Sequence, residues 1–317
     1  MSNARFATIA LLAGVLLIAG AQWIQNDYFF NAAYTVLMYV ILSTAWNILG
    51  GYTGYVNFGT AGFFALGVYS SIVLWKAFHP PLVVMIVVGT LVAALAGVGL
   101  GYLTMRLRGH FFAIATLALA IMLFTFVTNW DYAGGARGAY VIVPREVPFG
   151  FARYIRYLFS VMVLLSVASI VVARVVERSR LGRGLAAIRD DELAAECAGV
   201  PTLKLKLIST ALSGGMMGLA GTTFPFFISF VEPVGAFDLR YAVNAIAMPV
   251  IGGMTTWLGP LIGAVLLGTV QQLVQVTISS AWNLLIVGLL LVGFVTMAPE
   301  GIMGWVFAWR RRRARRS

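Results

Sequence analysis

Residues 178–206 read RSRLGRGLAAIRDDELAAECAGVPTLKLK, and they form a polar island between long apolar runs. The 317-residue chain is 61% hydrophobic and only 10% charged, yet charged side chains crowd this one stretch. An ionised side chain costs several kcal/mol in hydrocarbon, so the island cannot cross a bilayer. It must lie as a sizeable loop on one membrane face, and its position decides how the flanking runs are placed.

Apolar runs fill most of the remaining chain, whose mean hydropathy is +0.92. A helix needs about 20 apolar residues to cross a hydrocarbon core of roughly 30 Å. We therefore expect an all-α, polytopic membrane protein with about ten transmembrane helices (8–10), at residues 6–23, 33–49, 61–78, 82–103, 111–129, 157–174, 207–228, 241–256, 258–277 and 282–299. Residues 1–317 should form a single transmembrane domain, because no long stretch is polar enough for a soluble one and no GxxxxGK[ST] nucleotide-binding motif occurs.

The distribution of Lys and Arg predicts the orientation of these spans. With the N-terminus inside, most of the 22 basic residues fall on inner segments, chiefly in the island and in the tail at 309–317. The positive-inside rule then places both termini in the cytoplasm. The tail directly follows an apolar span, so we expect it to lie on anionic lipid headgroups and not to bind nucleic acid. The first span resembles a secretory signal, but we expect it to remain as an uncleaved helix.

Two glycine-rich interruptions break the apolar pattern, ILGGYTGYVNFGTAGFFALG at 48–67 and VIGGMTTWLGPLIGAVLLG at 250–268. Interrupted spans at corresponding places in two halves are typical of transport sites. The alternative is that these glycines only permit close helix packing. Together with polar residues of neighbouring spans, the breaks give a candidate pathway lining of Asn47, Gly51, Tyr52, Gly54, Asn57, Thr60, Thr116, Asn244 and Gly253.

The spans hold no Asp, Glu, Lys or Arg that falls securely at mid-membrane. An ion-driven carrier usually keeps an ionisable relay there, so we expect energy to enter through a partner. The island offers a docking element, because Ile188–Cys197 favours a helix with Asp190 or Asp191 as its N-cap and a stop at Gly199. The alternative is a solvated loop that only sets topology.

Enzyme chemistry and metal binding find little support in this sequence. His79 and His110 are isolated, so we expect no metal site, and no cluster of intramembrane acids, histidines or a Ser–Lys pair suggests catalytic residues. Cys197 is the only cysteine and lies in the island, where we expect no redox role. An autonomous secondary carrier and a membrane-embedded enzyme are the competing classes.

Several blocks of the chain resemble the branched-chain amino-acid ABC transporter permeases of the LivM type. The most specific are GRGLAAIRDDELAAECAGV at 182–200 and KLKLISTALSGGMMGLAGTTF at 204–224. Shorter blocks agree: GYTGYVNFGTAGFFALGVYSS at 51–71, LRGHFFAIATLALA at 107–120, AGGARG at 133–138 and APEGIMG at 298–304. The resemblance implies the permease subunit of a bacterial inner-membrane importer for branched-chain or related amino acids.

The same resemblance implies partners and site residues. They are a LivH-type sister permease, two cytoplasmic ATPase subunits that bind the ATP, and a periplasmic solute-binding protein, so this chain would need no cofactor. Carried onto this sequence, the ATPase-coupling residues would be Gly184, Arg189, Asp190, Glu192 and Gly199. Asn57 and Thr60 stand where many members carry Ser and His, which leaves urea, amides or other small polar metabolites as alternative solutes.

Overall fold

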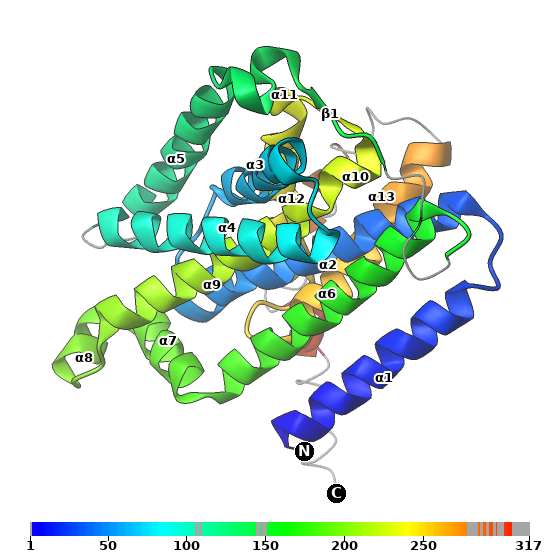
Figure 1. The fold of residues 1–317 in the computed structure, drawn as a ribbon. Helices are drawn as coiled ribbons and strands as arrows, with labels where there is room; N and C mark the ends of the chain where they lie inside the picture. Colours follow the sequence, from blue (N-terminus) through cyan, green and yellow to red (C-terminus); the bar gives the residue numbers. More distant parts are fainter. Residues whose placement is uncertain are drawn as a thin grey trace, which may run out of the picture.

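The computed structural model describes residues 2–104, 107, 110–143, 147, 151–277, 301–305 and single positions between 285 and 296. Helices dominate this part of the chain (Figure 1). The long helices are α1 Asn3–Ala21, α2 Asp27–Thr53, α3 Thr60–Phe78, α4 Leu82–Thr104, α5 His110–Thr128, α6 Tyr154–Arg178, α9 Thr202–Thr222, α12 Leu239–Gly252 and α13 Leu258–Thr277. Shorter helices are α7 Arg180–Asp190, α8 Glu192–Cys197, α10 Phe224–Ile228 and α11 Pro233–Ala236. Two 3-10 turns, Asp131–Ala133 and Gly135–Arg137, precede β1 Ala139–Tyr140, which pairs antiparallel with β2 Phe230–Val231.

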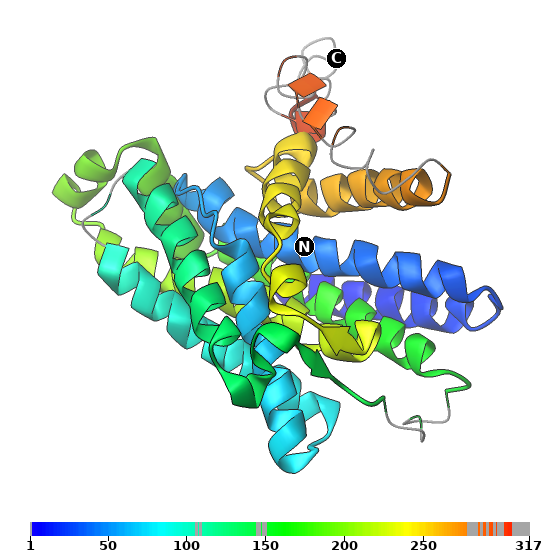
Figure 2. The same ribbon diagram turned by 90° about the horizontal axis from the view of Figure 1, so that it is seen from above.

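Helix α2 forms the centre of the bundle. Every residue from Met38 to Thr53 is buried, and the helix packs against α6, α9, α12 and α13. Helix α6 lies between α2 and α1, and the three run side by side in both views (Figures 1 and 2). The core therefore includes the helix that carries the first glycine-rich interruption.

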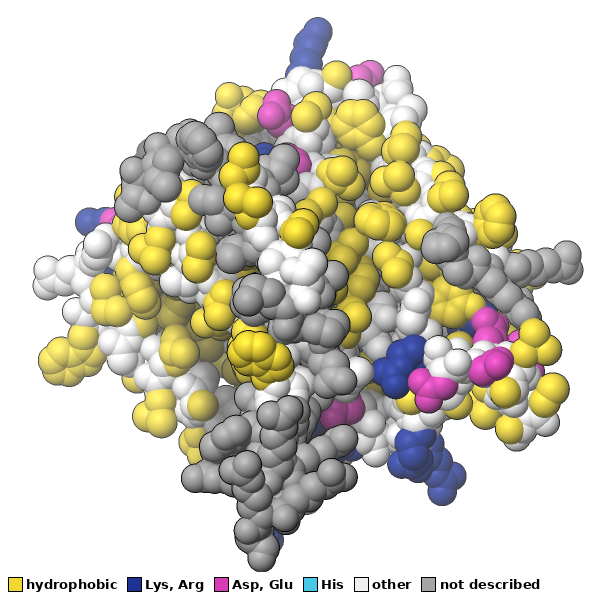
Figure 3. All heavy atoms as spheres, turned by 180° about the vertical axis from the view of Figure 1, so that it is seen from behind, with side chains coloured by type: hydrophobic (Ala, Val, Ile, Leu, Met, Phe, Trp, Pro, Cys, Tyr) yellow, Lys and Arg dark blue, Asp and Glu magenta, His cyan; other side chains and the backbone are white. Residues whose placement is uncertain are grey.

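The outer helices α1, α4 and α5 expose large apolar side chains. Leu16 is 71% exposed, Leu95 70% and Phe111 69%. Figure 3 shows hydrophobic side chains across one face of the molecule, with charged ones gathered over the α7–α8 end. A soluble protein rarely exposes such contiguous apolar surface, whereas lipid contact requires it. Among the described residues, nine helices are long and apolar enough to span a membrane, which confirms the polytopic all-α prediction.

Two crossings bring helix backbones into direct contact. A methyl group built on Gly67 of α3 would lie 1.9 Å from the Gly218 carbonyl oxygen of α9, and one on Gly263 of α13 would lie 1.8 Å from the Met248 carbonyl oxygen. Only glycine permits this approach, and small residues at helix interfaces are the usual means of close packing in lipid. The packing alternative thus accounts for these glycines.

The island folds differently from its expected single helix. Helix α6 continues to Arg178, and α7 follows at once, so Gly182 and Gly184 lie inside a helix rather than before one. The chain then turns at Asp191, whose φ of −160° and ψ of 112° are extended. Its side chain accepts a hydrogen bond from Ala194 N at 3.0 Å and so caps α8. Of the two expected caps, Asp191 is the one used.

The first interruption is also displaced along the chain. Gly50 and Gly51 are helical, and α2 ends only at Thr53, with Gly54 as a left-handed cap at φ 77°. The second interruption lies where expected, because α12 ends at Gly252 and Gly253 leaves the helix at φ 117°. The expected span 282–299 and the basic tail 309–317 fall outside the described residues, apart from single positions within the former.

Contacts place the beginning of α1 at the island end of the bundle. The Phe6 and Trp257 rings lie 4.8 Å apart, and the Arg174 guanidinium stacks 3.7 Å from the Phe6 ring, near the point where α6 runs into α7. At the other end, Arg156 donates to the Ile24 carbonyl at 3.1 Å and Arg153 pairs with Asp27. The beginning of α1 and the island therefore lie at the same membrane face.

This arrangement predicts the outcome of reporter fusions. A fluorescent protein that folds only in the cytoplasm should fluoresce when fused before Ser2 or after Val200, and alkaline phosphatase should be active when fused after Tyr140. The physical reason is the excess of Lys and Arg on the island side. An active phosphatase fused after Val200 would overturn this orientation.

Candidate functional site

The structure divides the candidate pathway residues between two places. The sequence candidates at the two helix breaks, with Thr116 beside them, lie toward the end of the bundle that carries α7 and α8. Asn244 lies apart from them, in a polar cavity that faces the beginning of α2.

The chain between α2 and α3 is an irregular segment at residues 54–59, in which Tyr55, Asn57 and Gly59 are buried. Its backbone finds partners in side chains: Trp46 Nε1 donates to the Asn57 carbonyl at 2.8 Å, and Phe58 N donates to Thr116 Oγ1 at 3.0 Å. Asn57 Oδ1 accepts from Gly59 N at 2.7 Å. Irregular backbone inside a membrane protein requires such partners. Asn57 and Thr116 therefore hold the turn, and the Asn57 and Thr60 side chains are fully buried.

The two glycine-rich breaks lie side by side. A methyl group on Gly51 would approach the Met254 carbonyl oxygen to 2.5 Å, so the α2 backbone runs directly against the second break. Asn47 Nδ2 donates to the Thr256 carbonyl at 3.4 Å. Gly51, Asn47 and Gly253 thus form one junction between α2 and the α12–α13 connection.

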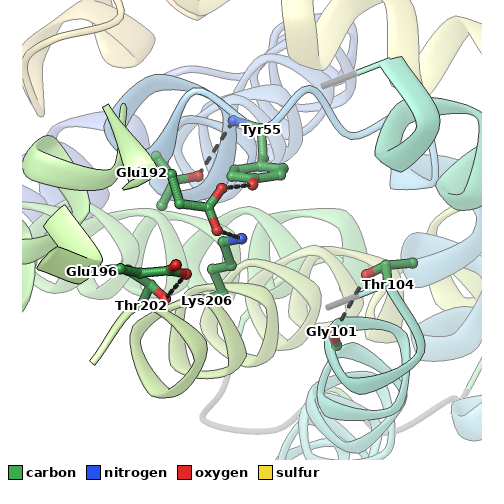
Figure 4. Close-up of polar contacts among 8 residues, drawn as sticks. Tyr55, Gly101, Thr104, Glu192, Glu196, Thr202 and Lys206 are labelled. Atoms are coloured by element: carbon green, nitrogen blue, oxygen red, sulfur yellow. Dashed lines mark hydrogen bonds and ion pairs between the residues drawn. The ribbon is translucent and has the colours of Figure 1, made fainter. Parts of the chain in front are cut away.

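This junction is clasped by three charged side chains, Arg189 of α7, Glu192 of α8 and Lys206 of α9. Arg189 Nη1 donates to the Gly51 carbonyl at 3.3 Å, and its side chain packs on Gly54. The Glu192 carboxylate accepts a hydrogen bond from the Tyr55 hydroxyl and pairs with Lys206 at the start of α9 (Figure 4). The Lys206 ammonium also lies 4.6 Å from the Tyr55 ring centre. The Lys206 and Glu192 side chains are only 11% and 14% exposed, so the pair is largely shielded from water.

A second carboxylate ties the junction to α6. Glu177 Oε2 accepts hydrogen bonds from Trp257 N at 2.6 Å and from the Tyr52 hydroxyl at 3.4 Å. One side chain at the end of α6 therefore reaches both breaks. Sequence reasoning did not select Glu177, Lys206, Tyr55 or Trp257 as site residues. The one signal in the sequence was the aromatic residue shared by the two breaks, which Tyr55 and Trp257 supply.

The other island candidates have different surroundings. Gly184 packs closely on Leu205 of α9, where a methyl group would lie 2.4 Å from Leu205 Cδ1. The Asp190 side chain is 74% exposed, and Leu193 of α8 is 58% exposed. Gly199 has φ 80° and nothing within 4 Å of the position a Cβ would take. The clasp thus leaves an outer face of α8 open to another molecule.

The polar cavity has a volume of about 360 Å³ and lies between α2, α10, α12 and α13. Gln271 Nε2 donates to Asn244 Oδ1 at 2.8 Å, and Asn244 Nδ2 donates to the Tyr39 hydroxyl at 3.1 Å. Arg240 pairs with Asp238 at 2.7 Å, and both residues line the cavity. The polar lining is completed by Asn31, Thr35, Tyr241, Gln272 and Gln275.

Broken membrane helices, a charged clasp on one face and a polar cavity toward the other define a transport permease. The chain belongs to the family described as branched-chain amino acid transport system / permease component, whose model matches residues 28–295. The resemblance drawn from the sequence motifs is confirmed. So is the assignment to the cell inner membrane.

Individual relatives agree with this membership. The chain is 29% identical to LivM of Escherichia coli, a high-affinity branched-chain amino acid transport system permease protein, over 86% of this chain and 69% of the relative. It is 27% identical to the probable branched-chain amino acid transport permease protein LivH of Methanocaldococcus jannaschii, over 80% of this chain and 84% of the relative. A shorter match, 31% identical over 40% of this chain and 38% of the relative, is to the autoinducer 2 import system permease protein LsrC of Salmonella paratyphi B. No solved structure matches.

The shielded Glu192–Lys206 pair predicts a non-additive pair of substitutions. Glu192→Gln or Lys206→Met alone should weaken the docking of α8 by about 1–3 kcal/mol, because each leaves one charge without its partner in a poorly hydrated place. The double variant should lose less than the sum. Hydrogen exchange of the α8 amides measures the effect, and Lys204→Met, at an exposed lysine of α9, is the matched control. Additive losses would show that the two charges do not interact.

Proposed function

We propose that this chain is a permease subunit of an ABC importer for branched-chain or related amino acids. It forms part of the translocation pathway and is moved by partner ATPases through α8. The observation that carries the proposal is the clasp by which Arg189 and Glu192 join the α7–α8 hairpin to the broken end of α2. The relatives are permease proteins of branched-chain amino acid transport, and the family description agrees.

The distribution of charge supports an external source of energy. Among the described residues, the buried charged side chains are Arg174 and Lys206, and both lie near the island. The helices between the two ends thus lack the ionisable relay that ion-driven carriers use. ATP would be bound and hydrolysed by two cytoplasmic partner subunits, and this chain would need no cofactor of its own.

The clasp gives a route for mechanical coupling. An ATPase that grips the open face of α8 would displace Glu192 and Arg189, and with them Tyr55 and the Gly51 carbonyl. Glu177 links the same junction to Trp257, so movement of α6 would reach the second break. A small displacement at the cytoplasmic face would therefore act on both helix breaks at once.

The other partners follow from surface chemistry and from the family. Asn31 and Gln275 are exposed beside the cavity, and polar side chains in spans avoid lipid by facing protein or water. A second, LivH-type permease subunit would cover this side, and a periplasmic binding protein would deliver the solute. The departures at Asn57 and Thr60 do not argue for urea or amides, because both side chains are buried in the turn and away from the cavity.

Reconstitution tests the proposed function directly. Proteoliposomes that hold this chain, its sister permease and the ATPases should take up radiolabelled leucine only with the binding protein outside and ATP inside. The chain alone should take up none, because it has no driving force. Uphill leucine uptake by the chain alone would establish a secondary carrier. Uptake of urea but no amino acid by the complete assembly would show that the solute belongs to the alternative class of small polar metabolites.

Charge reversal in the clasp should uncouple the transporter. Arg189→Glu or Glu192→Lys should lower leucine uptake by about tenfold or more, while the protein still inserts in the membrane, because coupling between distant sites is typically worth 5- to 150-fold. Lys76→Glu, a charge reversal at the opposite end of the bundle, is the control. Wild-type uptake by both clasp variants would refute the docking role of these residues.

A further inference from the structure

The cavity between α2, α10, α12 and α13 is lined by apolar and by charged side chains. Phe224 and Phe227 of α10, whose ring centres lie 6.4 Å apart, form an apolar wall, and Met38 of α2 and Val243 of α12 add apolar surface. Asp238 and Arg240, at the beginning of α12, supply one carboxylate and one guanidinium. Its volume of about 360 Å³ is at the lower end of the range for small-molecule sites, about 300–1,000 Å³. The volume and the lining together fit a small solute that carries a positive charge, a negative charge and an apolar group.

The two members of the ion pair differ in exposure, and the guanidinium is the more exposed one. Asp238 Oδ1 accepts from Arg240 N at 2.8 Å and caps α12, and Asp238 Oδ2 accepts from Arg240 Nε, also at 2.8 Å. The Asp238 side chain is 26% exposed and that of Arg240 is 65% exposed. Exposed ion pairs contribute only about 0–1 kcal/mol, so exchange of this pair for a ligand's charges costs little.

The floor of the cavity is held by a chain of neutral polar groups. Gln271 and Asn244 are 4% and 7% exposed, and the Asn244 amide is hydrogen-bonded to both Gln271 and Tyr39. Such amides avoid the cost of a buried charge and still present donors and acceptors to a bound polar solute. The cavity as a whole balances one carboxylate against one guanidinium, which matches a solute without net charge.

We propose that this cavity is a binding site for a zwitterionic α-amino acid with an apolar side chain. Arg240 takes the carboxylate through its planar fork, Asp238 takes the ammonium, and the Phe224–Phe227 wall receives the side chain. This site rests on the proposed transport function and deepens it, because it places a solute subsite inside this one subunit. A role of the pair in capping α12 alone would not explain the apolar wall beside it.

Thiol protection in the assembled transporter tests the site. With the native thiol removed by Cys197→Ala, Thr35→Cys places a reporter in the cavity lining, and a membrane-impermeant methanethiosulfonate reagent labels it from outside. L-leucine should slow this labelling. Leucinamide, which lacks the carboxylate, and 4-methylpentanoate, which lacks the ammonium, should not. Gln25→Cys, on the same face but outside the cavity, is the control and should be labelled at the same rate with and without leucine.

Substitutions at the ion pair then separate recognition from folding. Arg240→Gln should raise the half-protecting leucine concentration by about tenfold or more, the usual effect of losing a hydrogen bond between charged groups. Arg240→Lys should recover part of the loss. Asp238→Asn retains a capping oxygen while it removes the charge. Arg153→Gln, in the other ion pair of this face, should leave protection unchanged.

The outcomes distinguish the site from the transport function. If the complete transporter imports leucine but leucine leaves the labelling of Thr35→Cys unchanged, the proposed binding site is refuted and the transport function stands. Equal protection in wild type and Arg240→Gln would also overturn the assignment. If the complete assembly imports no amino acid, the transport function fails, and leucine protection of Thr35→Cys still reports on the cavity independently.

Discussion

A backbone amide that leaves a helix inside a membrane protein must find a partner, and the two helix breaks of this permease are built around that requirement. The segment at 54–59 obtains its partners from Trp46 of α2 and Thr116 of α5. The second break obtains one from Glu177 of α6. Because the partners come from several helices, the breaks can keep their shape only while those helices stay in register. The same contacts explain why polar side chains gather here in a mostly apolar chain.

Polar chemistry is concentrated at the two ends of the bundle. Ionised groups lie at the island end, where Glu192, Lys206, Arg189 and Glu177 surround the junction. At the opposite end, the cavity has neutral amides and hydroxyls, with one ion pair at the beginning of α12. Charged groups suit a surface where a soluble partner docks. Neutral groups with one ion pair of no net charge suit a site that a solute must leave as readily as it enters. Close apolar packing of α2, α3 and α9 connects the two ends.

Sequence reasoning located the spans well in the part of the chain that the structure describes, because apolar length is nearly the only property that lipid demands of a helix. It was less accurate at glycines. Gly50 and Gly51 were taken to interrupt α2, yet both are helical, and the second break packs against Gly51. The helix ends at Thr53, two residues beyond the pair, with Gly54 as its cap. Gly182 and Gly184 likewise lie within α7, a helix that was not expected.

Only part of the site could be predicted from the sequence. Composition and motifs selected Arg189 and Glu192, but their partners Gly51 and Tyr55 lie far away along the chain, and no local pattern announces such a meeting. Glu177 was not selected, because it lies between the expected span 157–174 and the island. Asn244 was selected for its polarity, but its connection to Tyr39 and Gln271 depends on the packing of three helices. Residue types and local motifs can be read from the sequence, whereas contacts between segments that lie far apart along the chain can be read only from the folded structure.

The backbone contact between Gly67 and Gly218 has a mechanical consequence. With no side chains between them, α3 and α9 have no compliant layer that could absorb a displacement. Helix α9 begins at Thr202, within the last residues of the island, and α3 begins directly after the segment at 54–59. A displacement of the α7–α8 hairpin would therefore move α9 and α3 together as a rigid unit. The displacement would reach the opposite end of the bundle without being absorbed on the way.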